Sequence, residues 1–400
     1  MIRKTLAGLA ACYLSATAAT ITLYQDTETG ALYTKPGPNR VKLGDFVDAK
    51  ELESMKKSQS AEMKKRLGVK VKSGVPTLKF SGTHYLGYTY VDDKTDANND
   101  ESRFETRRNY FQVKAYWNDT DYIRTTLDTF QNDDGSWLVR LKYAYIYLDN
   151  LLPYTGVEFG QVHRPWIDWE EHHGWLYRSI AKTFIEEGEG AHLTDSADLG
   201  INFKTKTEYF SSEMGVYNGA GYHHKHEGDS MSYEWRLTAN VLGTGKKHVH
   251  ATEDEYFDVS FTGQINNQKG YNWYGLHAVY NQPMFLIAGM FVNYENYKFD
   301  RSHNGWTVNG EIRPVEKWAI FARYDNFEYD SLDKDDEGNV LGILKKDVTR
   351  NQIVAGAAYT YNKNVKFIAN VFDIDDTDAE SAGGKVVDET KYMFTTEVHW

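Results

Sequence analysis

Connections of alternating length constrain this chain more than any other feature of its sequence. From Thr77 onward, sixteen segments alternate apolar and polar residues, and most are near the about 9–11 residues that a tilted strand needs to cross a bilayer. Connections after even-numbered segments are mostly short, as at 119–120 and 282–283, whereas those after odd-numbered segments are mostly long, as at 163–195 and 331–349. Short turns at one end and long loops at the other are typical of an outer-membrane β-barrel.

The sixteen segments are the predicted strands. They are 77–91, 109–118, 121–130, 138–148, 155–162, 196–204, 209–218, 232–242, 256–266, 271–280, 285–294, 306–313, 318–329, 350–361, 365–372 and 391–400. In the last segment, Tyr392, Phe394, Thr396, Val398 and Trp400 share one face, and mainly polar residues share the other. A final strand with no turn after it pairs with a strand already formed, and in a closed barrel that partner is the first strand.

Two connections break the alternation of lengths. The connection 243–255 is long where a turn is expected, and 267–270 is short where a loop is expected. A miscounted hairpin would explain both, so fourteen or eighteen strands are alternatives. We predict an all-β fold in which 77–400 forms a transmembrane antiparallel barrel of about sixteen strands.

The composition is rich in aromatic residues and yet polar. The chain has 29 Tyr, 19 Phe and 10 Trp, with a mean hydropathy of −0.62. Membrane helices would give a far more apolar mean, whereas strands with one lipid-facing and one water-facing side cancel in such an average. Arg140 and Lys142 fall in the middle of a segment, where a basic side chain facing lipid would cost about 2–4 kcal/mol. The predicted lumen is therefore wet.

Residues 1–19 have the features of an export signal. Two basic residues and a short apolar stretch precede a small-residue cleavage site at 16–18. Cleavage would remove Cys12, the one cysteine of the chain, and with it any disulfide or thiol chemistry. The alternative is that Cys12, which lies in a sequence resembling a lipoprotein processing box, becomes lipidated. In both cases we expect export, with the cell outer membrane as the destination.

Residues 20–76 are predicted to form a periplasmic extension ahead of the barrel. The part up to Phe46 shows no clear period, whereas 49–67 is rich in good helix formers and is followed by Gly68 as a stop. Its apolar positions are sparse and fit heptads poorly. We therefore expect a short helix, with a trimerising coiled coil as the alternative.

The net charge of −12 argues against nucleic acid as a partner. Acidic residues cluster in loop-like runs at 92–93, 333–337 and 373–378, which are typical of solvated loops. The alternative is that divalent cations bridge these runs to a neighbouring anionic surface. We expect the surroundings to be outer-membrane lipid and lipopolysaccharide.

The longest connection, 163–195, has an unusual composition for a loop. It is too rich in Trp and Tyr to lie free in water, so its rings need a surface on which to pack. The inside of the barrel offers that surface. We predict that this third loop folds inward, is partly helical and narrows the pore. The residues expected in the constriction are Trp166, Asp168, Trp169, Glu170, Glu171 and Trp175.

Four stretches carry a resemblance to a known family: 106–115, 143–146, 157–166 and 197–203. Together with the terminal strand, they are similar to the phosphate-selective porin O/P type of bacterial outer-membrane porins. The more specific elements are Arg107-Arg108, where two basic residues enter a strand, and the Gly-Gln-x-x-x-Pro-aromatic motif at 160–166. The resemblance implies a homotrimer of sixteen-stranded barrels, each with its third loop folded into the pore.

The sequence departs from that family where selectivity would be decided. His163 stands where the family often has Lys, and the inward-facing candidates mix acidic and basic side chains. Phosphate specificity is therefore not carried over. Arg124, Arg140 and Lys142 lie in neighbouring strands and would form a basic stripe, which an anion path requires. Pairing of these cations with Asp128 and with acidic loop residues is the alternative, and the sequence leaves both open.

We predict a passive channel for small hydrophilic solutes, anions or oxyanions rather than cations, in a Gram-negative bacterium, with no cofactor. The side chains expected to contact the solute are Lys114, Arg124, Arg140, Lys142, Arg164 and Arg178. One alternative is a sugar pore with a stacking track made of Trp166, Trp169, Trp175 and Tyr177. Another is a non-conducting structural or partner-binding barrel.

Metal and enzymatic chemistry are not expected. The histidine groups at 172–173, 223–226 and 248–250 lie in loops without cysteine partners, so no metal site is predicted. The run from Asp333 begins like a calcium loop but has Leu344 at the twelfth position, where a bidentate Glu belongs. The sequence also has no Gly-x-Ser-x-Gly nucleophile motif.

Overall fold

The structure is a computed structural model that describes residues 21–27, 29–46, 76–132, 134–188, 190–226, 228–243, 249–334, 340–376 and 387–400. The chain divides into two compact units, Met1–Val75 and Pro76–Trp400. The predicted export signal at 1–19 and the predicted helix at 49–67 lie outside the described residues. Within the described parts, no helix is long and apolar enough to span a membrane.

The first unit contains a small sheet that the sequence pattern did not indicate. Its strands are β1 (Ile21–Asp26), β2 (Leu32–Tyr33) and β3 (Arg40–Phe46), in the antiparallel order β2-β1-β3. Strands of two to seven residues, with a register shift between Leu23 and Tyr24, carry too short an alternation to be recognised.

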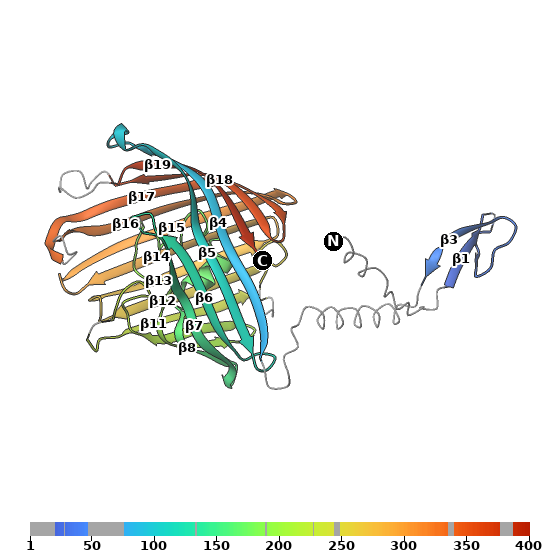
Figure 1. Ribbon diagram of the computed structural model, residues 1–400, viewed down its shortest axis with the longest axis horizontal. Helices are drawn as coiled ribbons and strands as arrows, with labels where there is room; N and C mark the ends of the chain where they lie inside the picture. Colours follow the sequence, from blue (N-terminus) through green and yellow to red (C-terminus); the bar gives the residue numbers. More distant parts are fainter. Residues whose placement is uncertain are drawn as a thin grey trace, which may run out of the picture. The chain divides into compact units, whose positions relative to one another are not determined.

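The second unit is a closed antiparallel barrel in which each strand pairs with the next (Figure 1). Its strands are β4 (Thr77–Asp93), β5 (Glu101–Tyr116), β6 (Tyr122–Gln131), β7 (Trp137–Leu152), β8 (Thr155–His163), β9 (Ala197–Lys206), β10 (Phe210–Tyr217), β11 (Ser232–Leu242), β12 (Tyr256–Asn266), β13 (Tyr271–Gln282), β14 (Phe285–Asn296), β15 (Arg301–Val315), β16 (Trp318–Lys334), β17 (Val340–Asn362), β18 (Val365–Asp375) and β19 (Glu389–His399). A short 3₁₀ helix, η1 (Ala97–Asn99), lies between β4 and β5.

The last strand closes the barrel against the first, as predicted. β19 pairs antiparallel with β4 from Glu389 opposite Asp93 to His399 opposite Thr83. The Trp400 amide donates to the Gly82 carbonyl at 3.1 Å, and the Trp400 ring lies where a Cβ at Gly82 would be. The prediction of sixteen strands is confirmed, and the alternatives of fourteen and eighteen are wrong.

Both irregular connections are real features of the barrel. The connection from β11 to β12 is long because its end folds back onto the barrel. The Ala251 carbonyl accepts hydrogen bonds from Asn281 Nδ2 at 2.9 Å and Arg313 Nη1 at 3.0 Å. Val249 packs against a buried apolar cluster that includes Leu286 of the inner wall. The extra length therefore covers apolar surface inside the barrel.

Several strands extend beyond their predicted ends. β5 begins at Glu101 rather than at 109, and β17 begins at Val340 rather than at 350. The added residues at 101–108 are mostly polar or charged, so they show no apolar face. They nevertheless form strand because the β4–β5 hairpin remains paired up to Val91 opposite Glu101.

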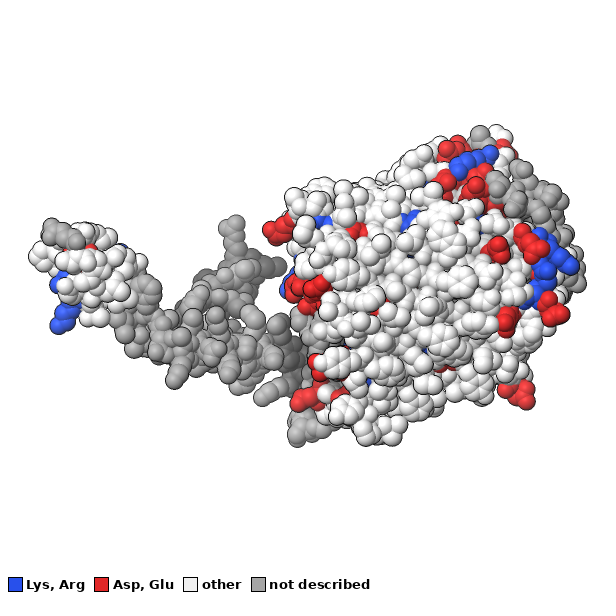
Figure 2. All heavy atoms as spheres, turned by 180° about the vertical axis from the view of Figure 1, so that it is seen from behind, with Lys and Arg blue, Asp and Glu red and all other residues white. Residues whose placement is uncertain are grey.

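Alternation of exposed and buried residues distinguishes the outside of the barrel from the inside. On β14, Ile287 and Phe291 are 53% and 52% exposed, whereas Leu286, Met290 and Val292 between and beside them are buried. The outer wall in Figure 2 is broad and almost free of charged side chains, which gather toward its ends. Such a surface fits the hydrocarbon region of a bilayer. The inner side of β14 is apolar as well, so it needs a cover of its own.

Candidate functional site

The cover is the connection between β8 and β9, residues 164–196, which packs inside the ring of strands (Figure 1). It begins with a short helix, α2 (Ile167–His173). Trp166, Trp169 and Phe184 of this loop form one cluster with inner-wall residues such as Trp273 and Val292. A second cluster joins the loop to the inner faces of β16–β19, and in it the Tyr177 ring stacks on Phe321 at 3.7 Å. The loop therefore fills the side of the lumen that is bounded by β12–β19.

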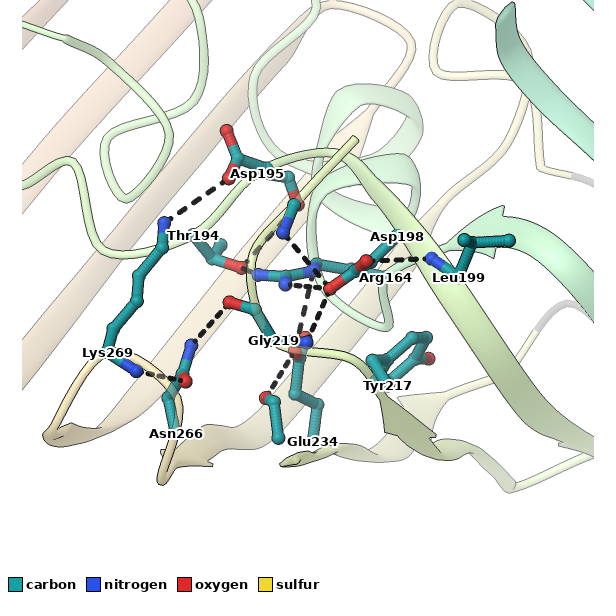
Figure 3. A network of polar contacts seen from close by, with 12 residues as sticks. Arg164, Thr194, Asp195, Asp198, Leu199, Tyr217, Gly219, Glu234, Asn266 and Lys269 are labelled. Carbon is teal, nitrogen blue, oxygen red and sulfur yellow. Dashed lines mark hydrogen bonds and ion pairs between the residues drawn. The ribbon is translucent and has the colours of Figure 1, made fainter. Parts of the chain in front are cut away.

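Arg164 fixes the loop where the chain leaves β8 (Figure 3). Its Nη2 lies 2.7 Å from Asp198 Oδ2, its Nη1 donates to Thr194 Oγ1 at 2.6 Å, and its Nε lies 3.4 Å from Glu234 Oε1. Asp198 Oδ2 also accepts the backbone N–H groups of Gly219 and Gly221 at 2.7 and 3.2 Å. Arg164 is 1% exposed, so burial and pairing assign it to anchoring the loop rather than to contact with a solute.

Arg178 closes a second clamp within the loop. Its guanidinium pairs with Glu171 and with both carboxylate oxygens of Glu186, and Nη2 lies 2.6 Å from Glu186 Oε1. Arg178 is buried by these contacts. Its charge is therefore compensated within the loop, which does not fit the solute contact predicted for Arg178.

Lys142 and Arg140, on β7, are also engaged. Lys142 is 1% exposed, donates to Ser196 Oγ and lies over the Tyr222 ring at 3.5 Å. Arg140 forms an ion pair with Asp128 at 2.7 Å, as the pairing alternative proposed. Lys142 is enclosed and the charge of Arg140 is paired, so the contact role expected for these two residues does not fit their surroundings.

Four cations face the part of the lumen that the loop leaves open, along β4–β6. Each lies over a tyrosine ring: Lys79 over Tyr116 at 4.5 Å, Arg108 over Tyr110 at 4.5 Å, Lys114 over Tyr122 at 4.7 Å and Arg124 over Tyr143 at 4.4 Å. Among the ion pairs of the described residues, none involves these four side chains. We call Lys79, Arg108, Lys114 and Arg124 the lumen cations. Lys114 and Arg124 are the two predicted contact residues among them.

A β-bulge brings Arg108 to the lumen. The register between β4 and β5 shifts after the Tyr85–Arg108 pair, because the next pair is Leu86 with Thr106, so Arg107 is the extra residue. Both arginines consequently point inward: Arg107 Nη1 donates to the Ser179 carbonyl at 3.0 Å, and Arg108 Nη1 to the Tyr85 hydroxyl at 3.3 Å. The double Arg is recognisable in the sequence as a motif, but alternation alone does not assign Arg108 to the pore.

A cavity of about 220 Å³ continues the basic surface between the loop and the wall. Its lining mixes basic and acidic side chains with a few apolar ones. The charged members are Arg103, Glu105, Arg107, Arg108, Arg178, Lys182, Glu187 and Lys391. Most of these basic groups are paired, because Arg107 contacts Glu105, Arg178 contacts Glu171 and Glu186, and Lys391 contacts Glu389.

The loop presents acid to the opposite side of the same space. Asp168, on α2, keeps 42% of its side chain exposed and lies 3.7 Å from His163 Nε2. The other predicted constriction residues are engaged in packing: Trp166, Trp169, Trp175 and Glu170 are buried, and Glu171 pairs with Arg178. Of the predicted set, Asp168 is therefore the side chain placed to face a passing solute.

One group in the described residues has the composition of a metal site. His303, Asp330 and Asp347 place one ligand atom each within 4.8 Å of one another. The Arg301 guanidinium already pairs with both carboxylates, and its Nε lies 2.9 Å from Asp330 Oδ2. An arginine supplies the positive charge that a metal would supply. We therefore interpret this group as an ion-pair network at the end of β15–β17.

The geometry defines a class of protein: a closed sixteen-stranded barrel with an apolar outer wall and a loop packed inside. Neither a family model nor a curated protein matches the chain. Among solved structures, an anion-selective porin from Comamonas acidovorans is similar over 81% of this chain and 99% of its own, with a TM-score of 0.55 and 11% identity. Outer-membrane expressed OmpT of Vibrio cholerae is similar over 82% and 99%, with a TM-score of 0.52 and 12% identity.

At such identities the similarity shows the fold, which is that of bacterial outer-membrane porins. A trimer form of in-vitro folded OmpT from Vibrio cholerae also matches, with a TM-score of 0.53 and 12% identity over 81% of this chain and 99% of that one. The finer resemblance to the phosphate-selective porin O/P type is supported by none of these matches, and it stays a prediction.

Proposed function

We propose that the protein is a passive diffusion channel that lets small hydrophilic anions cross the outer membrane. The observation that carries this proposal is the pairing of the lumen cations with tyrosine rings instead of carboxylates. A ring attracts a cation through its quadrupole but leaves the net charge unchanged. The open part of the lumen therefore keeps uncompensated positive charge, which is what an anion path requires.

The outer wall supports the membrane location. Exposed aliphatic and aromatic side chains on successive strands, such as Ile287, Phe291, Val308 and Ile320, would have no favourable surroundings in water. Lipid and lipopolysaccharide are the partners that this wall fits, and the expected export signal at 1–19 is in line with them. We extend the proposal to a homotrimer, in keeping with the porin fold and with the trimer form of one similar structure.

The sugar-pore alternative loses its physical basis. A stacking track needs ring faces that a sugar can reach, whereas Trp166, Trp169, Trp175 and Tyr177 are buried in the two loop clusters. A specific observation favours a second candidate, the non-conducting barrel: the loop, together with Val249, fills the lumen along β12–β19. Conductance separates this candidate from the anion channel.

The test is a planar-bilayer measurement of the purified protein in a KCl gradient. We expect stepwise conductance with a reversal potential that indicates preference for Cl⁻. The double variant Arg108→Gln/Lys114→Gln should shift the reversal potential toward cation preference, because two lumen charges are lost. Lys363→Gln removes an exposed charge in the turn after β17 and should leave the potential unchanged.

Three results would contradict the proposal. Cation preference of the unmodified protein would remove the anion path and keep the channel. Equal shifts in the double variant and in Lys363→Gln would show that the lumen cations do not set selectivity. Absence of conductance from correctly folded protein would favour the non-conducting barrel.

A further inference from the structure

His163 lies where three elements meet. It is the last residue of β8, and its ring packs against Tyr143 of β7 with 4.2 Å between centroids. Its Nε2 lies 3.0 Å from Arg124 Nη1 of β6 and 3.7 Å from Asp168 Oδ1 of α2. Its Nδ1 lies 3.5 Å from Glu158 Oε2, five residues earlier on the same strand. The side chain is 6% exposed.

The chemistry of arginine determines the protonation of this histidine. Guanidinium nitrogens only donate, so Nε2 must accept from Arg124, and the neutral ring then carries its proton on Nδ1. That proton faces Glu158 Oε2. Both His163 Nδ1 and Glu158 Oε2 are buried and make no hydrogen bond within the described residues. The two atoms face each other at 3.5 Å. Glu158 thus selects the tautomer that offers Nε2 to Arg124.

Arg124 is held entirely by neutral acceptors. Its Nε donates to Thr126 Oγ1 at 3.0 Å, and its Nη1 is shared between the Tyr145 hydroxyl at 3.2 Å and His163 Nε2 at 3.0 Å. No hydrogen bond of Nη2 is found in the described part of the chain. The guanidinium is therefore oriented on one side and free on the other, and its charge is not compensated.

We propose that neutral His163 is the positioning residue that holds Arg124 in its anion-binding orientation, and that protonation of His163 releases it. The inference rests on the proposed anion channel and deepens it by making the affinity of the lumen for anions depend on pH. Protonated His163 has no lone pair for Arg124 and places a second cation 3.0 Å from Nη1. Its two N–H groups would then turn to Glu158 and Asp168, whose carboxylates already face them.

The charged and titratable groups around His163 come from every element packed on it. They are Arg124 of β6, Tyr143 and Tyr145 of β7, Glu158 of β8, Asp168 of α2, Lys204 of β9 through its 3.4 Å contact with Glu158, and Tyr217 of β10, whose hydroxyl donates to the His163 carbonyl at 3.3 Å. The phenols are neutral between about pH 5 and 8. His172 of α2 also lies beside Asp168, with its Nδ1 2.6 Å from the Asp168 carbonyl oxygen. A substitution of His163 therefore decides whether a change in anion affinity over that range depends on His163.

The experiment measures block of the Cl⁻ current by sulfate, which stays a dianion over the range used. For the unmodified protein, the half-blocking sulfate concentration should rise about tenfold between about pH 8 and about pH 5. Arg124 then loses the hydrogen bond that orients it, while the charge gained by His163 is directed to the carboxylates of Glu158 and Asp168. His163→Gln keeps an acceptor oxygen and cannot be protonated. It should block like the unmodified protein at the higher pH and change less than about twofold on acidification.

His163→Leu removes the acceptor and should bind sulfate weakly at both pH values. If His163→Leu fails to fold, the comparison of His163→Gln with the unmodified protein still decides the matter. A His163→Gln channel that loses block on acidification as the unmodified protein does would overturn the inference, because another group would then titrate. A His163→Leu channel with full block at the higher pH would overturn it as well, since Arg124 would not need the acceptor.

The same measurements distinguish failure of the anion-channel proposal from failure of the role of His163. Cation preference of the unmodified protein at both pH values would overturn the anion channel and this inference together. Anion preference combined with a pH-independent sulfate block would overturn only the role of His163.

Discussion

The partner of each basic side chain decides what that side chain can do in this barrel. Arg164 and Arg178 meet carboxylates in buried surroundings and hold the loop in place. Arg108 and Arg124 meet phenol rings and hydroxyls, which orient a guanidinium without cancelling its charge. The same residue type therefore serves as an anchor in one place and as a source of potential in another.

Loss of the Arg164 guanidinium should destabilise the barrel strongly. Arg164→Met leaves Asp198 and Glu234 buried without their cation, and breaking a buried pair in this way costs about 3–5 kcal/mol. Arg103→Met is the matched control, because Arg103 pairs with Glu101 and Glu105 at the exposed end of β5, where a pair contributes about 0–1 kcal/mol. Thermal unfolding in detergent should show a clearly lower midpoint for Arg164→Met alone. Equal midpoints for the two variants would contradict the anchoring role.

At the scale of elements, the inward loop behaves as the core of the barrel. Its clusters cover the apolar inner faces of β14 and β16–β19, and α2 places Glu170 within this packing. Glu170 is buried and accepts a hydrogen bond from Trp166 Nε1 at 2.5 Å. Burial raises the pKa of Glu170 from 4.5 to about 8, against the opposing effects of Arg323 and of the Trp166 hydrogen bond.

The direction of this shift predicts that the packed loop weakens in alkaline solution. A carboxyl group with a raised pKa in the folded protein stabilises the fold fully below its ordinary pKa, and this contribution is lost as the pH rises through the folded pKa of about 8. The midpoint of thermal unfolding should therefore fall between about pH 6 and about pH 9 in the unmodified protein. Glu170→Gln, which keeps the acceptor for Trp166, should fall less.

Glu253→Gln is the control for the Glu170 prediction, because Glu253 is an exposed residue of the connection before β12. It should follow the pH profile of the unmodified protein. A Glu170→Gln profile that coincides with that of the unmodified protein would show that Glu170 does not titrate in this range.

The whole molecule separates its charges in space. The chain has a net charge of −12, yet the lumen cations form a basic surface inside it. Charged residues on the outside gather toward the ends of the wall in Figure 2. The sign of the selectivity therefore follows from the local lining, and the net charge of the chain does not determine it.

Selectivity that arises from fixed lumen charge should weaken with salt. The Debye length falls from about 10 Å at 0.1 M to about 3 Å at 1 M, which confines the potential of each cation to its immediate surroundings. The ratio of Cl⁻ to K⁺ permeability should accordingly fall toward one as KCl is raised over that range. Arg108→Gln/Lys114→Gln should show a smaller dependence. A permeability ratio that is constant with salt would point to selection by size instead.

The barrel could be predicted from the local sequence pattern. Period-2 alternation and the lengths of connections are local properties, and they predicted sixteen strands and closure of the last strand on the first, both of which the register bears out. The aromatic content of 163–195 likewise indicated a segment that needs a surface to pack on. The local pattern missed the short sheet at 21–46 and the first part of β5 at 101–108, where no apolar face exists.

Which cations line the pore depends on contacts between distant parts of the chain. Arg124, Arg140 and Lys142 look equivalent in the sequence. The register of β6 with β7 places Arg140 opposite Asp128, with which it forms an ion pair, and Lys142 is buried and donates to Ser196 Oγ. A bulge of one residue turns Arg108 inward, and alternation alone cannot predict it. Ion pairing depends on residues distant in the chain that meet through register and loop placement. The charge left over for a solute is therefore a property of the folded barrel.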